Sequence, residues 1–307
     1  MKAVRSSLGI VAMVLGSMLF PIAGTAGAAP GGAGFPVTVK AANGSVTIAK
    51  RPTAIVSLSA TATEMLYAIG AGSQVKAVDK YSNYPKGTPM TSLDGYSVNA
   101  EAIAKYHPDL IVVAYDPPAL AAQLAKLKIP VIYDPAAANL AVAYHQYLGL
   151  GAATGHLLGA QREVAHLRTV VTSIVKATPR PPAGTTYYYE LDPTYYSVTS
   201  GTFMGQLLGL LGLHSIADKA GVNSNGGYPQ LTAEFILQAN PTYIFLADHG
   251  CCKATPATVA ARPGWSALSA VANHRIVTLS DDIASRWGPR IVILLQEVAN
   301  ELKRQQG

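Results

Sequence analysis

The sequence predicts an α/β fold with two Rossmann-like lobes joined by a long, rigid helical linker. Short apolar runs of strand character alternate with helix-like segments over residues 51–138 and again over 183–307. The intervening segment 139–182 has helical periodicity and no strand pattern. Strands that alternate with helices indicate parallel sheets covered on both faces, so each alternating region is expected to form one lobe.

The first lobe begins after an N-terminal extension, residues 29–50, which contains a short strand pattern from Val37. A helix is expected to end at Gly70, because glycine commonly terminates helices. Strands are expected at 54–58, 75–78, 110–114 and 131–133, and helices at 61–69, 99–106 and 119–127.

The linker is expected to contain two helical pieces separated by a Gly-rich break at 149–155. The second piece stops before Pro179, since proline cannot continue a helix. A helical linker bends less readily than a loop, so only small closure of the lobes is expected. Apolar residues in this piece recur at steps of three and four, which predicts one buried face: Leu157, Ala160, Val164, Leu167, Val171 and Ile174.

The second lobe repeats part of the first. Segments 99–114 and 232–247 share six of 16 residues, with the helix start, the Glu, the Pro and the strand in register. The helix end at 64–70 aligns in the same way with 206–212. Internal similarity favours two lobes built from related units, and the alternative is one sheet with a long helical insertion. Further strands are expected at 243–247 and 276–279, and a last helix at 288–305.

The first 28 residues have the pattern of a cleavable export signal. Lys2 and Arg5 precede an apolar run of about 15 residues, and Ala26–Ala28 fits a cleavage site. A membrane anchor is the alternative, but a spanning helix needs roughly 20 residues and this run contains Pro21. We therefore expect a periplasmic or otherwise exported protein that is soluble after cleavage. No Cys lies near the cleavage point, so no lipid anchor is expected.

The composition excludes several classes of function. Hydrophobic residues make up 50% of the chain and charged residues only 13%, which excludes a disordered chain. The net charge is +6, but the basic residues form no dense run, so no nucleic-acid partner is expected. Neither a G-x-S-x-G nor an H-E-x-x-H motif occurs, so a hydrolase is not expected. The 16 Tyr residues suit a ligand cleft, because their rings are apolar and their hydroxyls form hydrogen bonds.

Several segments together carry a resemblance to a known family. They are Ile55–Ser59 with Thr63 and Glu64, Tyr81–Pro85, Asn99–Ile103 with His107–Ile111, Gly227–Thr232, and Ser280–Asp282 with Arg286–Ile291. With them, residues 50–305 resemble the binding proteins of ABC importers for iron chelates, haem and vitamin B12, most of all the vitamin B12-binding members.

The resemblance implies a monomeric solute-binding protein that is not an enzyme and has no cofactor. It is expected to hold a bulky metal chelate between its lobes and deliver it to an ABC permease dimer at the membrane. Cobalamin or a related corrinoid is the expected ligand, with a ferric siderophore or haem as alternatives. A haem or metal chaperone on the same fold, which serves another protein partner, also stays open.

Tyrosines are the first candidates for ligand contact, because ligands of open α/β sheets bind at the carboxyl ends of strands. Tyr115 directly follows one expected strand, and Tyr81 and Tyr84 follow another. Tyr228 lies in a Gly-rich loop of the second lobe. The resemblance places ligand-binding aromatics at Tyr81, Tyr115 and Tyr228, but two of the three are Trp in the vitamin B12-binding members. Tyr also ligates haem iron, and any one of these residues could simply pack on a lobe surface.

The loop 280–290 supplies four more candidate ligand contacts, Asp281, Asp282, Arg286 and Trp287. Arg can bind a carboxylate or phosphate through two N–H groups, and corrinoids, siderophores and haem propionates all offer such groups. The alternative is an internal Asp–Arg pair that shapes the loop. Arg290 is expected to be structural, since the start of a helix disfavours cations.

Glu101 and Glu234 each lie two positions after a helix cap. A carboxylate there is stabilised by the helix dipole by about 0.3–1 kcal/mol, which explains either residue alone. The resemblance implies that each of them meets Arg residues of the permease. Two separated charges would fix the docking orientation and raise the encounter rate.

Cys251 and Cys252 are the only cysteines, and they are adjacent. They could form a vicinal disulfide or remain free thiols. With His249 they could also bind a metal, but adjacent cysteines ligate one tetrahedral ion awkwardly, so no metal site is expected.

Overall fold

The computed structural model describes residues 34–97, 99–115, 120–220 and 225–305. The chain divides into two units, residues 1–31 and 32–307, and the described residues all belong to the second. The predicted signal peptide, residues 1–28, lies outside the described residues. None of the helices in the described ranges is long and apolar enough to span a bilayer.

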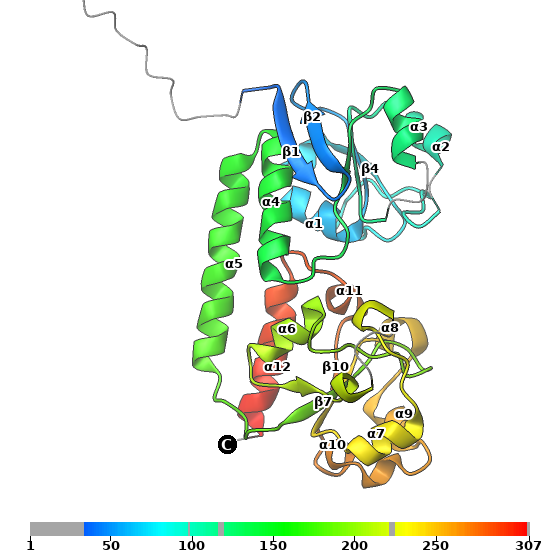
Figure 1. The fold of residues 1–307 in the computed structure, drawn as a ribbon, viewed down its shortest axis with the longest axis vertical. Helices are drawn as coiled ribbons and strands as arrows, with labels where there is room; N and C mark the ends of the chain where they lie inside the picture. Colours follow the sequence, from blue (N-terminus) through cyan, green and yellow to red (C-terminus); the bar gives the residue numbers. More distant parts are fainter. Residues whose placement is uncertain (1–33, 98, 116–119, 221–224, 306–307) are drawn as a thin grey trace, which may run out of the picture. The chain divides into compact units, whose positions relative to one another are not determined.

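Two four-stranded parallel sheets form the framework of this unit (Figure 1), which confirms the predicted fold class and excludes the single-sheet alternative. In each sheet the first strand in sequence lies between the second and the third, and the fourth lies at the edge. The first sheet has the order β4 (Val75–Val78), β3 (Ile55–Leu58), β5 (Leu110–Val113), β6 (Val131–Tyr133). The second has the order β8 (His214–Ser215), β7 (Thr186–Glu190), β9 (Tyr243–Leu246), β10 (Ile276–Thr278).

Helices alternate with these strands. In the first region they are α1 (Ala60–Ala68), α2 (Ala100–Ala104) and α3 (Leu120–Lys126), with a short 3-10 helix at Gly72–Gln74. In the second they are α6 (Phe203–Gly209), α7 (Ala233–Ala239), α8 (His249–Cys252), α9 (Pro256–Ala260), α10 (Ser269–Ala272), α11 (Asp281–Ala284) and α12 (Ile291–Arg304), with 3-10 helices at Ile216–Lys219, Asn225–Gly227 and Trp265–Ala267. The N-terminal extension forms an antiparallel hairpin of β1 (Val37–Ala41) and β2 (Gly44–Ile48), of which the sequence pattern predicted only the first strand.

The internal repeat extends to backbone conformation. His107 and Asn240 occupy matching positions after α2 and α7, and both adopt left-handed φ angles, 48° and 45°. A proline follows each of them, and a buried strand then begins, β5 or β9. Positive φ is uncommon for residues other than glycine, although Asn and His adopt it more often than most, so its occurrence at both matching positions indicates a shared helix–strand connection.

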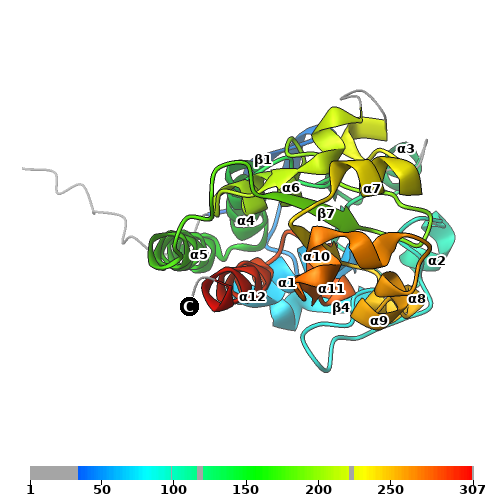
Figure 2. The same cartoon turned by 90° about the horizontal axis from the view of Figure 1, so that it is seen from below.

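Two helices, α4 (Leu140–Thr154) and α5 (Leu157–Ala177), occupy the segment predicted to be the helical linker. Val164 and Leu167 of α5 pack in a core with the first sheet, whereas Val171 and Ile174 pack in a core with the second. The helix therefore contributes to both cores, as a linker would. Figures 1 and 2 also show α12 beside α5. The exact lobe and linker boundaries stay a prediction.

The break in the linker is shorter than predicted and lies at the end of the expected range. Gly149 and Gly151 are helical, and α4 ends only at Gly155, which has a left-handed φ of 75°. Gly151 faces α5 so closely that an added Cβ would lie 2.5 Å from the Ala160 Cβ atom. Close approach of two helices, rather than a chain break, explains the glycine at this position.

Two predicted helices are shorter than expected. α2 covers 100–104 rather than 99–106, with the Asn99 side chain accepting hydrogen bonds from the Glu101 and Ala102 N–H groups. α12 starts at Ile291 rather than at residue 288, because the Arg286–Arg290 segment is held in a different conformation by contacts with other parts of the chain, above all with Glu64.

Candidate functional site

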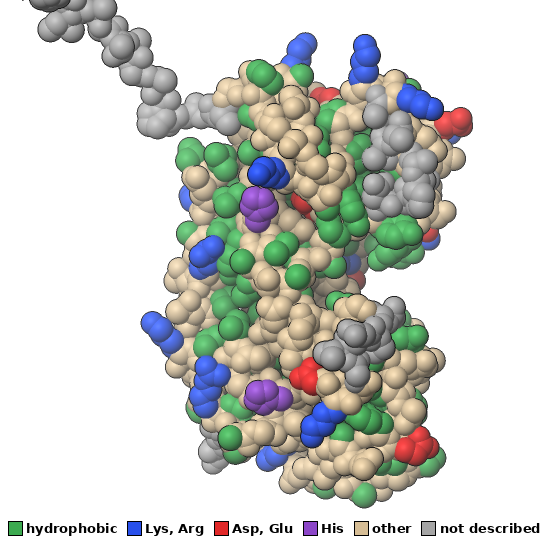
Figure 3. Space-filling view, viewed as in Figure 1, with side chains coloured by type: hydrophobic (Ala, Val, Ile, Leu, Met, Phe, Trp, Pro, Cys, Tyr) green, Lys and Arg blue, Asp and Glu red, His purple; other side chains and the backbone are tan. Residues whose placement is uncertain are grey.

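A cavity of about 520 Å³ lies at the carboxyl end of the first sheet. Ser59, Asp79 and Tyr115 line it from positions just after β3, β4 and β5. The opposite wall comes from the segment 282–287, which follows the second sheet. The space-filling view shows this face of the molecule hollowed (Figure 3). Parallel α/β sheets bind ligands at this edge, so the cavity is the candidate binding site.

Three tyrosine rings line this cavity. The Tyr81 and Tyr96 ring centroids are 5.5 Å apart and nearly perpendicular, and those of Tyr96 and Tyr115 are 6.3 Å apart. The three side chains are 43%, 70% and 47% exposed, so the rings are open to a ligand. Exposed aromatic rings beside a cavity offer large apolar area with hydroxyls at the edge. The set Tyr81, Tyr96 and Tyr115 is called the tyrosine rim below.

Sequence reasoning missed Tyr96, because it follows no strand. The residue before it, Gly95, explains its place: a Cβ there would lie 2.6 Å from both the Asp79 carboxylate and the Leu58 carbonyl oxygen. Only glycine lets this loop lie against the ends of β3 and β4, which carries the next residue to the rim. A Gly-Tyr pair in a polar loop was the available signal.

A second cavity of about 210 Å³ lies against the second sheet. It is mostly apolar, with Tyr228, Phe203 and Met204 among its lining residues. Burial raises the pKa of the Tyr228 hydroxyl. The residues that line both cavities are Ala136, Ser285, Arg286 and Trp287. The two cavities therefore meet at this segment, and together they contact residues from both sheets.

Arg286 lines both cavities, but its terminal N–H groups are engaged within the protein. Nη1 donates to Glu64 Oε1 at 2.8 Å and to Asn83 Oδ1 at 3.0 Å. Nη2 donates to the Tyr81 carbonyl at 3.0 Å and to Asp282 Oδ1 at 2.9 Å. The internal Asp–Arg pair, which was the alternative to ligand contact, is thus present. Ligand contact by Arg286 stays a prediction.

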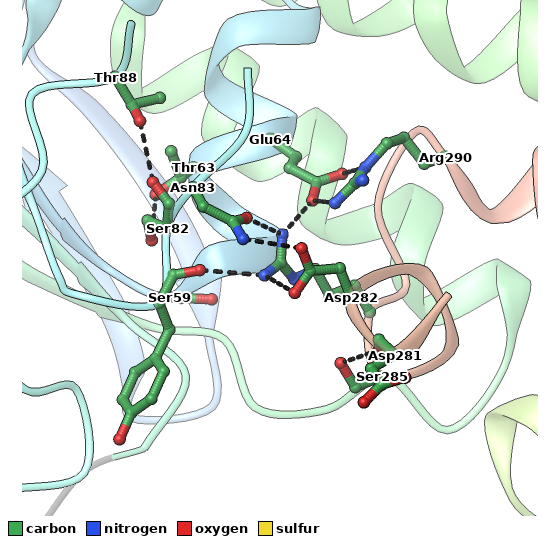
Figure 4. Close-up of polar contacts among 12 residues, drawn as sticks. Ser59, Thr63, Glu64, Ser82, Asn83, Thr88, Asp281, Asp282, Ser285 and Arg290 are labelled. Atoms are coloured by element: carbon green, nitrogen blue, oxygen red, sulfur yellow. Dashed lines mark hydrogen bonds and ion pairs between the residues drawn. The ribbon is translucent and has the colours of Figure 1, made fainter. Parts of the chain in front are cut away.

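Glu64 is the centre of this network, and sequence reasoning did not identify it as a site residue. It is fully buried in α1 and also accepts hydrogen bonds from Arg290 Nε and Nη2, at 3.0 and 2.5 Å (Figure 4). Two carboxylates, Glu64 and Asp282, thus balance two guanidiniums. Burial of charges is tolerated only with such pairing. Arg290 has the structural role that was expected. The network joins α1 to the loop before α12, although more than 200 residues separate them.

The remaining loop candidates separate in the structure. Trp287 lines both cavities, and its indole N–H donates to Gln146 of α4 at 2.6 Å. Asp281 lines neither cavity; its carboxylate accepts from the Gly250 and Cys251 N–H groups at 2.9 and 2.8 Å. Asp282, the next residue of α11, does line the larger cavity, so two adjacent residues of this short helix contact different parts of the chain.

Tyr84 also lines neither cavity. Its ring lies 4.2 Å from the Arg290 guanidinium carbon, which is a cation–π contact. Asp79 was not predicted, but it lines the larger cavity and is buried. Burial raises the pKa of its carboxyl group, although hydrogen bonds from Ser82 and the Tyr81 N–H oppose the shift.

Glu101 and Glu234 are exposed at the second residue of α2 and α7. The side chains of Asn99 and Thr232 cap the two helices, so neither glutamate is needed as the N-cap. The two glutamates stay available for another role.

Cys251 and Cys252 form a vicinal disulfide in α8, rather than free thiols. Among the residues that the structure describes, no group of three or more His, Cys, Asp or Glu side chains is placed to hold a metal ion.

Two parallel α/β sheets with adjoining cavities at their edges are the arrangement expected of a bilobal binding protein. A family model described as "Periplasmic binding protein" matches residues 55–283. The chain belongs to this family, which consists of substrate-binding transport proteins.

Individual relatives agree with this assignment. The chain is 30% identical over 279 residues to an uncharacterized ABC transporter substrate-binding lipoprotein, YvrC, of Bacillus subtilis, and the match covers 87% of this chain and 86% of the relative. The crystal structure of the periplasmic vitamin B12 binding protein BtuF of Vibrio cholerae has a TM-score of 0.69 and 27% identity, over 83% of this chain and 98% of that one.

The periplasmic heme-binding protein RhuT from Roseiflexus sp. RS-1 has the same fold, with a TM-score of 0.72 and 20% identity over 83% of this chain and all of that one. The fold therefore occurs with different ligands, and the ligand of this chain has to be argued from its own site.

Proposed function

We propose that this protein is an exported substrate-binding protein of an ABC importer that captures cobalamin or a related corrinoid between its two α/β units. The single observation that carries the proposal is the tyrosine rim at the larger cavity, continuous with an apolar cavity that contains Tyr228. A flat, bulky ligand buries large area against such rings, while their hydroxyls fix its orientation.

The importer role is supported by the family and by YvrC, and the corrinoid by the relatives named for vitamin B12. The protein carries the ligand unchanged in this proposal, so affinity and release are its measurable properties. A ferric siderophore or haem is the second candidate, because exposed tyrosine hydroxyls at the rim could ligate iron.

Calorimetric titration of the purified protein with cyanocobalamin, a ferric hydroxamate and haemin tests the ligand. We expect tight binding of cyanocobalamin, weakened at least about tenfold by Tyr81→Ala or Tyr115→Ala. Tyr84→Ala is the matched control, since Tyr84 is similarly exposed but lines neither cavity. If haemin alone binds tightly, the ligand of this protein is haem and the corrinoid proposal is wrong.

We also propose that Glu101 and Glu234 dock the loaded protein on its permease. Both carboxylates are exposed at corresponding helices of the repeat, and both helices have other caps. The double variant Glu101→Gln/Glu234→Gln should keep its ligand affinity and lose uptake in cells. Glu297→Gln, an exposed carboxylate on α12, is the control. Normal uptake by the double variant would contradict the docking role.

Export is proposed from the N-terminal pattern, and the family name agrees with it. The B. subtilis relative is described as a lipoprotein, whereas no Cys precedes Cys251 in this chain. The mass of the mature protein in the exported fraction would show where the chain is cleaved and whether a lipid is attached.

A further inference from the structure

The cationic and anionic side chains at the larger cavity differ in whether they are available to bind a ligand. Among the described residues that line it, Arg286 is the one cation, and each of its terminal nitrogens donates two hydrogen bonds inside the protein. All four Nη N–H bonds are thus engaged, and binding of an anion through two N–H groups needs at least one of them. By sequence, segments 116–119 and 221–224 contain no Lys, Arg or His.

Neighbouring cations are paired as well. Lys80 lies 5.1 Å from the Tyr81 ring centroid, but its ammonium group is 2.8 Å from the Asp94 carboxylate. Arg290 is bound to Glu64. Neither cation is therefore left to neutralise an anionic ligand group.

Acceptors, in contrast, are plentiful. Asp282 lines the cavity with its side chain 43% exposed; its Oδ1 accepts from Arg286 and its Oδ2 from Asn83 at 2.7 Å, which leaves further lone pairs on both oxygens. Asp79 lines the cavity as a buried carboxyl. Each carboxylate oxygen can accept more than one hydrogen bond, and the hydroxyls of the tyrosine rim can also accept. The wall is thus matched to a ligand surface that donates hydrogen bonds.

We propose that this site selects ligands of zero or positive net charge whose inward face carries hydrogen-bond donors such as carboxamides, with Asp282 as the residue that excludes anionic groups. This inference rests on the proposed function. An added carboxylate would be desolvated without a free cation and would face Asp282 and Asp79, which is unfavourable. A carboxamide of the same shape would instead donate to these oxygens.

The test compares ligands that differ in charge but hardly in shape. The first pair is cyanocobalamin and its monocarboxylic acids, in which one side-chain amide is hydrolysed. The second is a cationic ferric hydroxamate and the same compound with its amine succinylated. For each pair of which at least one member binds, we expect the more anionic member to have an affinity at least about tenfold lower than its partner at pH 8.

Asp282→Asn should reduce this difference to less than about threefold, because it removes one negative charge from the cavity wall, whereas its amide oxygen can still accept from Arg286. Glu101→Gln, an exposed carboxylate that lines neither cavity, should leave the difference unchanged.

Equal or tighter binding of the anionic members, or an undiminished difference in Asp282→Asn, would overturn the inference and leave the proposed function standing. Tight binding of haemin, with its two propionates, and of neither neutral nor cationic probe would overturn it as well. No binding of any probe would instead overturn the proposed function, and the inference with it.

Discussion

Replacing Glu64 by Gln should destabilise the protein strongly, because Glu64 is the buried anion of the arginine network. Glutamine keeps the shape of the side chain but removes the charge shared by Arg286 and Arg290, whose side chains are only 8% and 15% exposed. Its amide N–H₂ group would also face a guanidinium where a carboxylate oxygen accepts now.

The expected size follows from that burial. Removing one partner of a buried ion pair costs about 3–5 kcal/mol, because the remaining charge stays desolvated. For domains of about 150–250 residues, 1 kcal/mol corresponds to roughly 2–4 °C in Tm, so Tm should fall by roughly 6–20 °C. The lower part of this range is expected here, since the chain is longer.

Thermal unfolding followed by circular dichroism, with urea unfolding alongside, measures the effect. Glu101→Gln is the matched control: the same substitution at an exposed position in the first turn of a helix should cost less than about 1 kcal/mol. A Tm for Glu64→Gln within about 2 °C of the wild-type value would refute the reasoning, because the network would then contribute no net stability.

Three further predictions concern other parts of the fold. Burial and the nearby Glu190 carboxylate raise the pKa of Asp248 from 3.8 to about 7. The stability that this protonated carboxyl group contributes is therefore complete below pH 3.8 and lost as pH rises through 7. The Tm of Asp248→Asn relative to that of the wild type should rise between about pH 5 and 8, and a constant difference would contradict this. Alkylation of the denatured protein without reductant should add no mass, and alkylation after reduction should modify Cys251 and Cys252; adducts without reductant would show free thiols. Gly95→Ala should lower both Tm and ligand affinity, because its Cβ would meet the ends of two strands at 2.6 Å, and unchanged affinity would argue against Tyr96 as part of the site.

The candidate site was predictable where it follows strand ends. Tyr115 directly follows one buried apolar run and Tyr81 lies three residues after another, and the rule that ligands bind at the carboxyl edge was enough to select them. The same rule selected Tyr84, which turns instead to Arg290. Asp281 and Asp282 are adjacent in sequence and equivalent in character, yet only Asp282 lines the cavity. One residue along a helix rotates a side chain by about 100°, and which rotation faces the cavity depends on packing.

The sequence by itself determined the order of helices and strands and the duplication of the α/β unit, because these depend on local periodicity, proline and glycine, and residues close along the chain. The tertiary structure alone decided that Glu64 meets Arg286 and Arg290, that Gly95 brings Tyr96 to the rim, and that the one cation of the described cavity wall is already paired. Such contacts join residues far apart in the chain, and their geometry is fixed only when both sheets and the helices between them have packed.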